Sequence, residues 1–138
     1  MTVEEKRREL AKYRMKQAEE SLEEAKFLLS GNKSPRSVIN RVYYAMFYSV
    51  PALLIYEQYS SSKHSGVLSY FNRRFIKEGI FEKELGRFLN QAFELRQQED
   101  YREYTTLNLE QISPYIEKAE SFIKAVKEYL IHHKNILQ

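Results

Sequence analysis

The sequence contains no cysteine, which excludes disulfide bonds and metal sites built on thiolates. Glycine and proline are scarce, with 4 and 3 residues, so there is little material for the tight turns of an all-β protein. No apolar run approaches the roughly 18 residues that a membrane-spanning helix needs. The first residues, MTVEEKRREL, lack the apolar stretch of a signal peptide. From these absences we expect a cytoplasmic protein with no membrane segment.

The charged residues nearly balance, because 22 Lys and Arg stand against 19 Asp and Glu and leave a formal net charge of +3. So small an excess does not by itself indicate nucleic-acid binding, for which a local basic patch matters more than the total. Only three histidines occur, at positions 64, 132 and 133. No metal-ligand motif and no glycine-rich phosphate loop accompanies them. We therefore expect no metal ion and no other cofactor.

Residues that favour helices dominate what is present, chiefly Glu, Lys, Leu, Ala, Gln and Arg. With 43% hydrophobic and 30% charged residues, the composition is that of a folded globular protein rather than a disordered one. A chain of 138 residues has the usual length of one domain. The sequence therefore predicts a single all-α domain over residues 1–138, built as a helical bundle.

Apolar residues recur at helical spacing in five segments of the chain. They predict an up-and-down bundle of four long helices and one shorter helix, the shorter one at residues 65–78. The long helices are expected at residues 2–30, 34–55 and 81–98, and from either Leu109 or Ser113-Pro114 onwards, with residues 100–108 as a loop.

Start and stop signals support the first two helices. Thr2 followed by Glu5 has the spacing of a capping box, and Gly31-Asn32 is a typical helix stop. Ser34-Pro35 suits an N-cap and a first helical residue. The second helix is apolar around most of its circumference, so we expect it in the middle of the bundle. In the first helix the apolar positions are Leu10, Tyr13, Ala18, Leu22, Ala25, Leu28 and Leu29.

An arginine stands at the start of an aromatic stretch in the second helix, RVYYAMFYSV, residues 41–50. Seven residues of helix place Tyr48 about 20° from Arg41 around the axis and about 10 Å further along it, with Tyr44 between them. The three side chains can therefore share one stripe. One interpretation is that they are core and interface aromatics beside an arginine that extends to solvent. The other is an RNA or nucleotide site, in which the guanidinium binds phosphate and the rings stack on bases.

The surrounding segment, SVINRVYYAMFYSVPALL, carries the pattern Arg-x-Tyr-Tyr-Ala-x-Phe followed by a polar residue. In this it resembles the central-helix signature of the HEPN domain family. The likeness continues in the same order through SKHSGVLSYFNRRFIKEGIF, ELRQQEDYREY and IEKAESFIKAVKEYL. It thus covers nearly the whole chain, and it implies the helical bundle of that family.

The resemblance implies a metal-independent endoribonuclease, which in many members is the toxin of a toxin–antitoxin pair with a minimal nucleotidyltransferase as partner. It also implies a homodimer in which two copies of an active-site motif meet. That motif is an Arg followed, after four to six residues, by a His. By this correspondence Arg41 and Tyr48 are the candidate catalytic residues. Arg41, Tyr44 and His64 are the candidates for binding RNA or a nucleotide.

Tyr48 departs from the motif, because the family's histidine would fall on this position. An imidazole with a pKa of about 6.5 exchanges protons at neutral pH, whereas a phenol with a pKa of about 10 is a poor base. Arg41 can still stabilise negative charge that develops on a reacting phosphate. His64 resembles the family's histidine at the opening of the third helix. It either caps and orients that helix or lies at the binding face.

Arg96, Asp100 and Tyr101 resemble a further family pattern, Arg-x3-Asp-Tyr. We interpret them as a structural ion pair and a packing tyrosine. The alternative is that Arg96 contributes positive charge to a binding cleft.

Two functions of different kinds follow. The first is a toxin-like component that binds or cleaves RNA and pairs with a nucleotidyltransferase antitoxin, which Arg41 favours. The second is a non-catalytic interaction module that dimerises and docks a nucleotidyltransferase. Tyr48 favours either this module or a degenerate form of the first function that still binds RNA or a nucleotide. In both cases we expect a homodimer, because the apolar second helix and the stripe of Tyr44 and Tyr48 would leave an exposed patch on a monomer.

Overall fold

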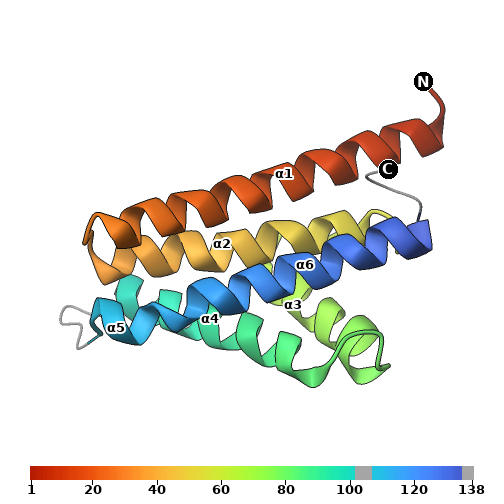
Figure 1. Ribbon diagram of the computed structural model, residues 1–138. Helices are drawn as coiled ribbons and strands as arrows, with labels where there is room; N and C mark the ends of the chain where they lie inside the picture. Colours follow the sequence, from red (N-terminus) through yellow and green to blue (C-terminus); the bar gives the residue numbers. More distant parts are fainter. Residues whose placement is uncertain (102–106, 135–138) are drawn as a thin grey trace.

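The computed structural model describes the backbone of residues 1–101 and 107–134, and the side chains of residues 1–99 and 107–133. The helical elements are α1 (Val3–Ser30), α2 (Pro35–Leu54), α3 (His64–Phe71), the π-helix η1 (Asn72–Lys77), α4 (Lys83–Tyr101), α5 (Leu109–Ile112) and α6 (Pro114–Lys134) (Figure 1). These residues include no β-strand and no helix with the length and apolarity to cross a bilayer.

The four long helices α1, α2, α4 and α6 alternate in direction, which confirms the predicted all-α up-and-down bundle (Figure 1). Three features differ from the prediction. The segment expected as one helix at residues 65–78 is α3 followed by the π-helical η1. Both expected starts of the last helix are used, since Asn108 caps the short α5 and Pro114 begins α6. The loop expected from Asp100 begins later, because α4 extends to Tyr101.

The predicted caps of the first two helices are confirmed. Thr2 accepts a hydrogen bond from the backbone N–H of Glu5, whose carboxylate accepts one from the Thr2 N–H. α1 ends at Ser30, and the following Asn32 adopts a positive φ of 52°. Ser34 caps α2 by accepting from the backbone N–H of Ser37. These local bonds satisfy donors that a helix start leaves unpaired, and they fix where the two helices meet.

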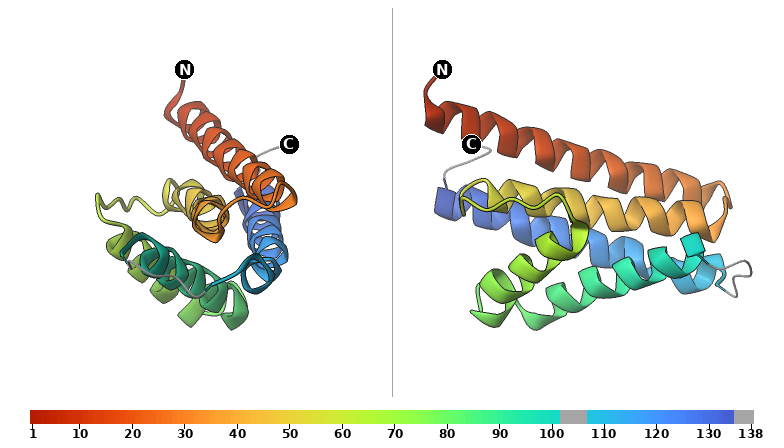
Figure 2. Two further views of the ribbon diagram at one scale, coloured as in Figure 1. Left: turned by 90° about the vertical axis from the view of Figure 1, so that its left-hand side faces the viewer. Right: turned by 180° about the vertical axis from the view of Figure 1, so that it is seen from behind.

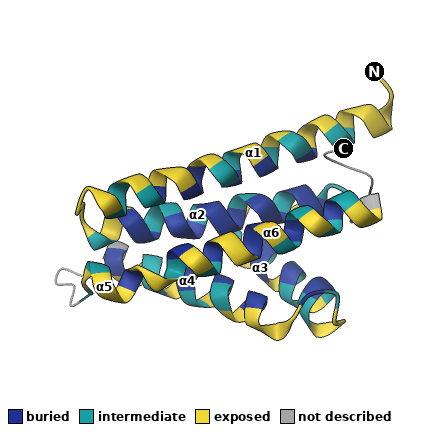
Figure 3. Cartoon of the chain, in the orientation of Figure 1, coloured by how far each residue is buried: buried dark blue, intermediate teal, exposed yellow. Residues whose placement is uncertain are grey.

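α2 is the central helix, as its apolar circumference predicted. It contacts α1, α4 and α6, and its residues are mostly buried (Figures 2 and 3). Tyr43, Ala45, Met46 and Val50 are fully buried. The other helices therefore form a shell around α2, with their polar faces outward.

The buried face of α1 differs in part from the prediction. It consists of Ala11, Met15, Ala18, Leu22 and Ala25, in which alanine recurs every seven residues. Leu10 and Tyr13, expected to be in the core, are 43% and 55% exposed. The alanine side chains at positions 11, 18 and 25 have one carbon each, which allows α1 to approach α2 closely.

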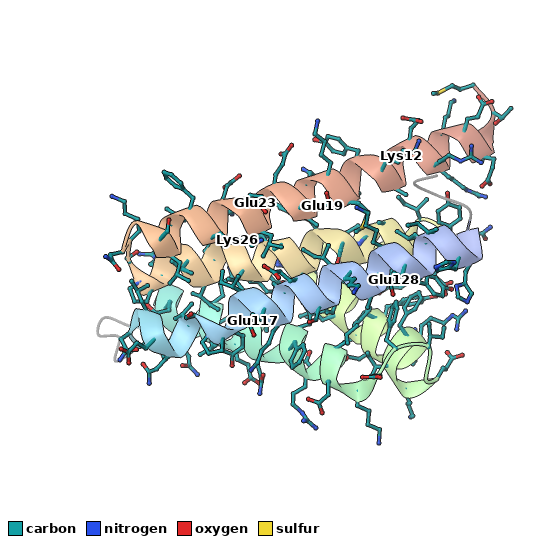
Figure 4. The ribbon with its side chains drawn as sticks, viewed as in Figure 1. Lys12, Glu19, Glu23, Lys26, Glu117 and Glu128 are labelled. Atoms are coloured by element: carbon teal, nitrogen blue, oxygen red, sulfur yellow. The ribbon has the colours of Figure 1, made fainter. Side chains whose placement is uncertain are left out.

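Surface ion pairs join α1 to α6 on the side shown in Figure 4. Lys26 Nζ lies 2.9 Å from Glu120 Oε1, and Lys127 Nζ lies 3.0 Å from Glu19 Oε1. All four side chains are more than a third exposed. Such pairs stabilise a fold by only about 0–1 kcal/mol each, so apolar packing holds α1 in place.

A largely buried carboxylate fixes the chain where it leaves α2. Glu57 is only 10% exposed and accepts hydrogen bonds from Arg74 Nε at 2.7 Å and from the Tyr70 hydroxyl at 2.8 Å. Tyr59 stacks on the Tyr70 ring with 4.2 Å between centroids. The turn after α2 is thereby tied to α3 and η1, and residues 55–63 run back alongside α2 (right-hand view of Figure 2).

Replacement of Glu57 by glutamine should lower the free energy of unfolding by about 2 kcal/mol, because it removes the charge from a largely buried ion pair. Glu78→Gln is the matched control, since Glu78 pairs with the same Arg74 at 3.3 Å but is 55% exposed. Loss of the Glu78–Arg74 ion pair should lower the free energy of unfolding by less than about 1 kcal/mol. Urea unfolding measures both values, and equal effects would contradict the role assigned to Glu57.

Candidate functional site

The return of the chain alongside α2 brings the start of α3 against Tyr43. This tyrosine is fully buried, and its hydroxyl lies 3.2 Å from Nδ1 of His64, twenty-one residues away. Burial raises the pKa of the Tyr43 phenol far above its ordinary value, although the positive charge of Arg96 opposes the shift. Tyr43 therefore stays protonated, and its hydroxyl serves as a hydrogen-bond partner for His64.

α4 contributes an arginine to the same place. The guanidinium carbon of Arg96 lies 5.3 Å from the ring centroid of Tyr43 and 5.1 Å from that of Tyr44. Both distances are within the range of cation–π attraction. The sequence favoured a structural ion pair with Asp100 for this residue, and the side chains of Asp100 and Tyr101 lie outside the described residues. The ion pair with Asp100 therefore stays a prediction, and the positive charge of Arg96 lies beside the rings of Tyr43 and Tyr44.

Arg41 approaches the same ring from α2. Its guanidinium carbon lies 5.3 Å from the Tyr44 centroid. Nε and Nη2 donate to Asn40 Oδ1 at 3.1 and 2.8 Å, and Nη1 lies 3.5 Å from Glu24 Oε2 on α1. The Glu24 side chain is 57% exposed, so its hold on Arg41 is weak. Tyr44 is thus within reach of two cationic groups, one from α2 and one from α4.

Tyr44 also contacts the two remaining predicted residues. Its ring centroid lies 5.2 Å from that of Tyr48 and 5.9 Å from that of His64. We call Arg41, Tyr44, Tyr48, His64 and Arg96 the arginine–tyrosine cluster. The structure brings all four predicted site residues into it, but through Tyr44 rather than by direct contact between Arg41 and Tyr48.

His64 lies between the arginine–tyrosine cluster and the hydrophobic core. Its ring is 4.2 Å from that of Phe47, and it is half-buried. Burial lowers the pKa of His64, and the charge of Arg96 lowers it further. The imidazole is therefore neutral at neutral pH and can accept a proton. His64 does not cap α3, because the N-cap residue is Lys63 and α3 begins at His64 itself.

Arg41 also borders a surface hollow of about 510 Å³. Arg36, Ser37 and Asn40 line it together with Arg41, all from the first half of α2. Guanidinium, hydroxyl and amide groups are the donors that bind phosphate oxygens. No three His, Asp or Glu side chains of residues 1–99 and 107–133 are grouped so that they could hold a metal ion.

The sequence reasoning missed the roles of Tyr43 and Phe47, whose rings pack against the ring of His64. Both belong to the quoted motif, RVYYAMF, but residue spacing alone could not distinguish them from ordinary core residues. Their contacts with His64 cross the loop between α2 and α3, whose path the sequence does not fix, so only the folded chain shows these contacts.

The HEPN domain family profile matches residues 11–129 of this sequence. The chain belongs to the HEPN domain family. The "UPF0332 protein" of Thermotoga maritima is 45% identical over 121 residues, which cover 88% of this HEPN chain and 91% of that protein. A Methanocaldococcus jannaschii protein named "Putative toxin" is 38% identical over 132 residues, covering 96% and 88% of the two chains. A second protein of that name and organism is 36% identical over 113 residues, covering 82% and 83%.

The lowered pKa of His64 predicts that acidification destabilises the folded HEPN chain. The unfolded chain takes up the proton near the ordinary pKa of about 6.5, whereas the folded chain takes it up only at lower pH. Between these values the unfolded state binds more protons, so the free energy of unfolding falls as the pH falls through that window.

Urea unfolding at about pH 7.5 and about pH 5.5 measures this effect. His64→Asn is the control, because it leaves a polar side chain beside Tyr43 that does not titrate. The variant should lose less stability on acidification than the parent. The same pH dependence in both proteins would show that His64 is not responsible.

Proposed function

We propose that this HEPN protein is a toxin-like component that binds RNA at the arginine–tyrosine cluster and acts with a minimal nucleotidyltransferase as its antitoxin. The observation that carries the proposal is the convergence of Arg41 and Arg96 on the ring of Tyr44. RNA supplies phosphates that guanidinium groups bind and flat bases that stack on tyrosine rings.

The weakness of the existing partner supports phosphate binding at Arg41. Its ion pair with the exposed Glu24 is 3.5 Å long and involves one nitrogen, whereas a phosphate can accept two parallel hydrogen bonds from a guanidinium. The adjoining hollow with Arg36, Ser37 and Asn40 gives room for the next phosphate along a strand. Binding of this kind is electrostatic and should weaken with salt.

The cluster also contains a proton carrier. Tyr48 is a poor base, but the neutral imidazole of His64 lies in the same cluster, 5.9 Å from the Tyr44 ring. When His64 Nδ1–H donates to the Tyr43 oxygen, Nε2 keeps a lone pair that can accept a proton from a ribose hydroxyl. The hydroxyl oxygen then attacks the adjacent phosphorus, the bond from phosphorus to the 5′ oxygen breaks, and the protonated His64 or water returns a proton to the departing oxygen. Arg41 and Arg96 stabilise the charge that develops on the phosphate during this step, which needs no metal ion.

The pairing with a nucleotidyltransferase rests on family membership and on the two relatives named as toxins. A short nucleotidyltransferase reading frame beside the gene for this chain would support it. The second candidate function, a non-catalytic module that only dimerises and docks such a partner, is favoured by Tyr48 at the position of the motif's histidine.

Arg41→Ala should weaken the binding of single-stranded RNA about tenfold or more, because a charge-assisted hydrogen-bond pair is lost. Arg41→Lys should recover only part of the affinity, since lysine keeps the charge but not the planar fork. Arg87→Ala is the matched control, because Arg87 is 58% exposed on α4 and pairs with Glu84 outside the cluster. Fluorescence anisotropy of labelled RNA, with a metal chelator present, measures the RNA affinity of the parent and the three variants. Equal affinities of the parent and Arg41→Ala would refute the proposed site.

The parent protein and its Arg41→Ala, His64→Asn and Tyr48→His variants distinguish cleavage from binding alone. We expect metal-free RNA cleavage that Arg41→Ala and His64→Asn abolish and that Tyr48→His increases, because the last change adds a second imidazole to the cluster. RNA binding without cleavage by any of them would leave a binding protein. If none of these proteins binds or cleaves RNA, the interaction module is favoured.

We also propose a homodimer, although the reason given by the sequence needs correction. Tyr44 and Tyr48 are half-buried within one chain, because α2 is surrounded by α1, α4 and α6. Among residues 1–99 and 107–133, the large apolar side chains that are exposed lie at the N-terminus and along α1. They are Met1, Val3, Leu10, Tyr13 and Phe27.

Analytical ultracentrifugation at micromolar concentration should give twice the mass of one 16.5 kDa chain. Phe27→Arg and Tyr48→Arg then locate the interface, since a charge in a dimer seam disfavours association. Dissociation by Tyr48→Arg alone would place the interface at the arginine–tyrosine cluster. A parent protein that sediments as a monomer would contradict the proposal.

A further inference from the structure

An apolar groove of about 610 Å³ lies directly beyond His64. Leu10 from α1, Phe47 and Pro51 from α2, and Val67 from α3 form its apolar surface. Residues 58–62 of the returning loop close one side of it. Leu10 is 43% exposed here because it faces the groove rather than the core, which explains why its predicted burial was wrong.

A few polar groups converge on this apolar surface. Arg14 lines the groove from α1, and one of its N–H groups donates to Gln17 Oε1 at 2.9 Å, which leaves other donors of the guanidinium for a ligand. Gln58 and Ser62 line the groove from the loop. Apolar walls with a small number of placed donors and acceptors, in a hollow of this volume, are typical of a site for one small molecule or group.

The groove is continuous with the arginine–tyrosine cluster. His64 borders the groove and contacts Tyr44 as well, and Phe47 lies against His64. Along α2, Tyr44, Tyr48 and Pro51 follow one another at helical spacing on one face, and Pro51 lies about 10 Å beyond Tyr44. A strand held at Arg41 and Arg96 therefore meets the groove if it continues along α2.

We propose that this groove is a subsite for one unpaired base of the bound RNA. The proposal rests on the proposed function, because the cluster supplies the phosphate contacts that anchor the strand. The base stacks against the apolar and aromatic walls, and its edge bonds to Gln58, Ser62 or Arg14. Arg14 lines the groove itself, and Arg41 and Arg96 lie in the adjoining cluster, so positive charge stands both in the groove and beside it. This suits a base with its attached phosphate and does not suit an apolar protein helix.

The absence of tryptophan from the chain makes a sharp test available. Leu10→Trp places a single tryptophan at the groove, and Val3→Trp places one at an exposed aliphatic position of the same helix that does not line it. Each variant is titrated with a short single-stranded RNA and with an abasic ribose-phosphate oligomer of equal length. Tryptophan emission reports on base contact, and the anisotropy of the labelled oligomers reports on binding.

We expect the base-bearing RNA to change the emission of Leu10→Trp, through stacking or displacement, while the abasic oligomer and Val3→Trp give no change. Adding Arg41→Ala should abolish the signal, because the strand is no longer anchored. RNA that binds in an Arg41-dependent way without a base-dependent signal at position 10 would overturn the base subsite and leave the proposed function standing. RNA that does not bind at all would refute the proposed function itself. An emission change on concentrating Leu10→Trp without RNA would assign the groove to self-association and overturn the proposal.

Discussion

The burial of α2 is the constraint on which the rest of the structure depends, because a helix that is apolar on nearly all sides must be covered on nearly all sides. α1, α4 and α6 provide that cover. The alanines at every seventh position of α1 allow this helix to pack closely, so the exposed ion pairs between α1 and α6 add little. Any helix that covers α2 is brought within reach of the side chains that α2 carries.

The burial of Tyr43 determines where the arginine–tyrosine cluster forms. A fully buried phenol needs a hydrogen-bond partner, and in this chain the partner is His64. The loop after α2 must therefore return far enough for α3 to begin beside Tyr43, and Glu57 holds that loop through Arg74 and Tyr70. The histidine is half-buried as a result, which lowers its pKa and leaves it neutral.

The electrostatics of the arginine–tyrosine cluster favour an anion. The guanidinium carbons of Arg41 and Arg96 lie no more than about 10 Å apart, since 5.3 and 5.1 Å separate them from the same ring centroid. Both cations therefore contribute to a local positive field around the Tyr44 ring. The Tyr44 ring attracts both guanidinium groups, and the exposed Glu24 holds Arg41 only weakly. A phosphate near the Tyr44 ring would be attracted by both groups, which is the physical reason for proposing RNA as the ligand.

The sequence by itself determined the all-α class, the capped starts of α1 and α2, the central place of α2 and the family, because these depend on local hydrogen bonds, periodicity and motif. It also identified Arg41, Tyr44, Tyr48 and His64 as candidates. It could not determine that Leu10 faces a groove and Ala11 the core, since neighbouring positions on a helix differ only by which surface the partner helix covers. Nor could it determine that Tyr44 joins the site residues or that Arg96 reaches it, because those contacts connect α2 with α3 and α4 across loops whose paths no local rule fixes. Only tertiary packing decides them, since the path of the chain after α2 follows from burying Tyr43 and Glu57 with their partners.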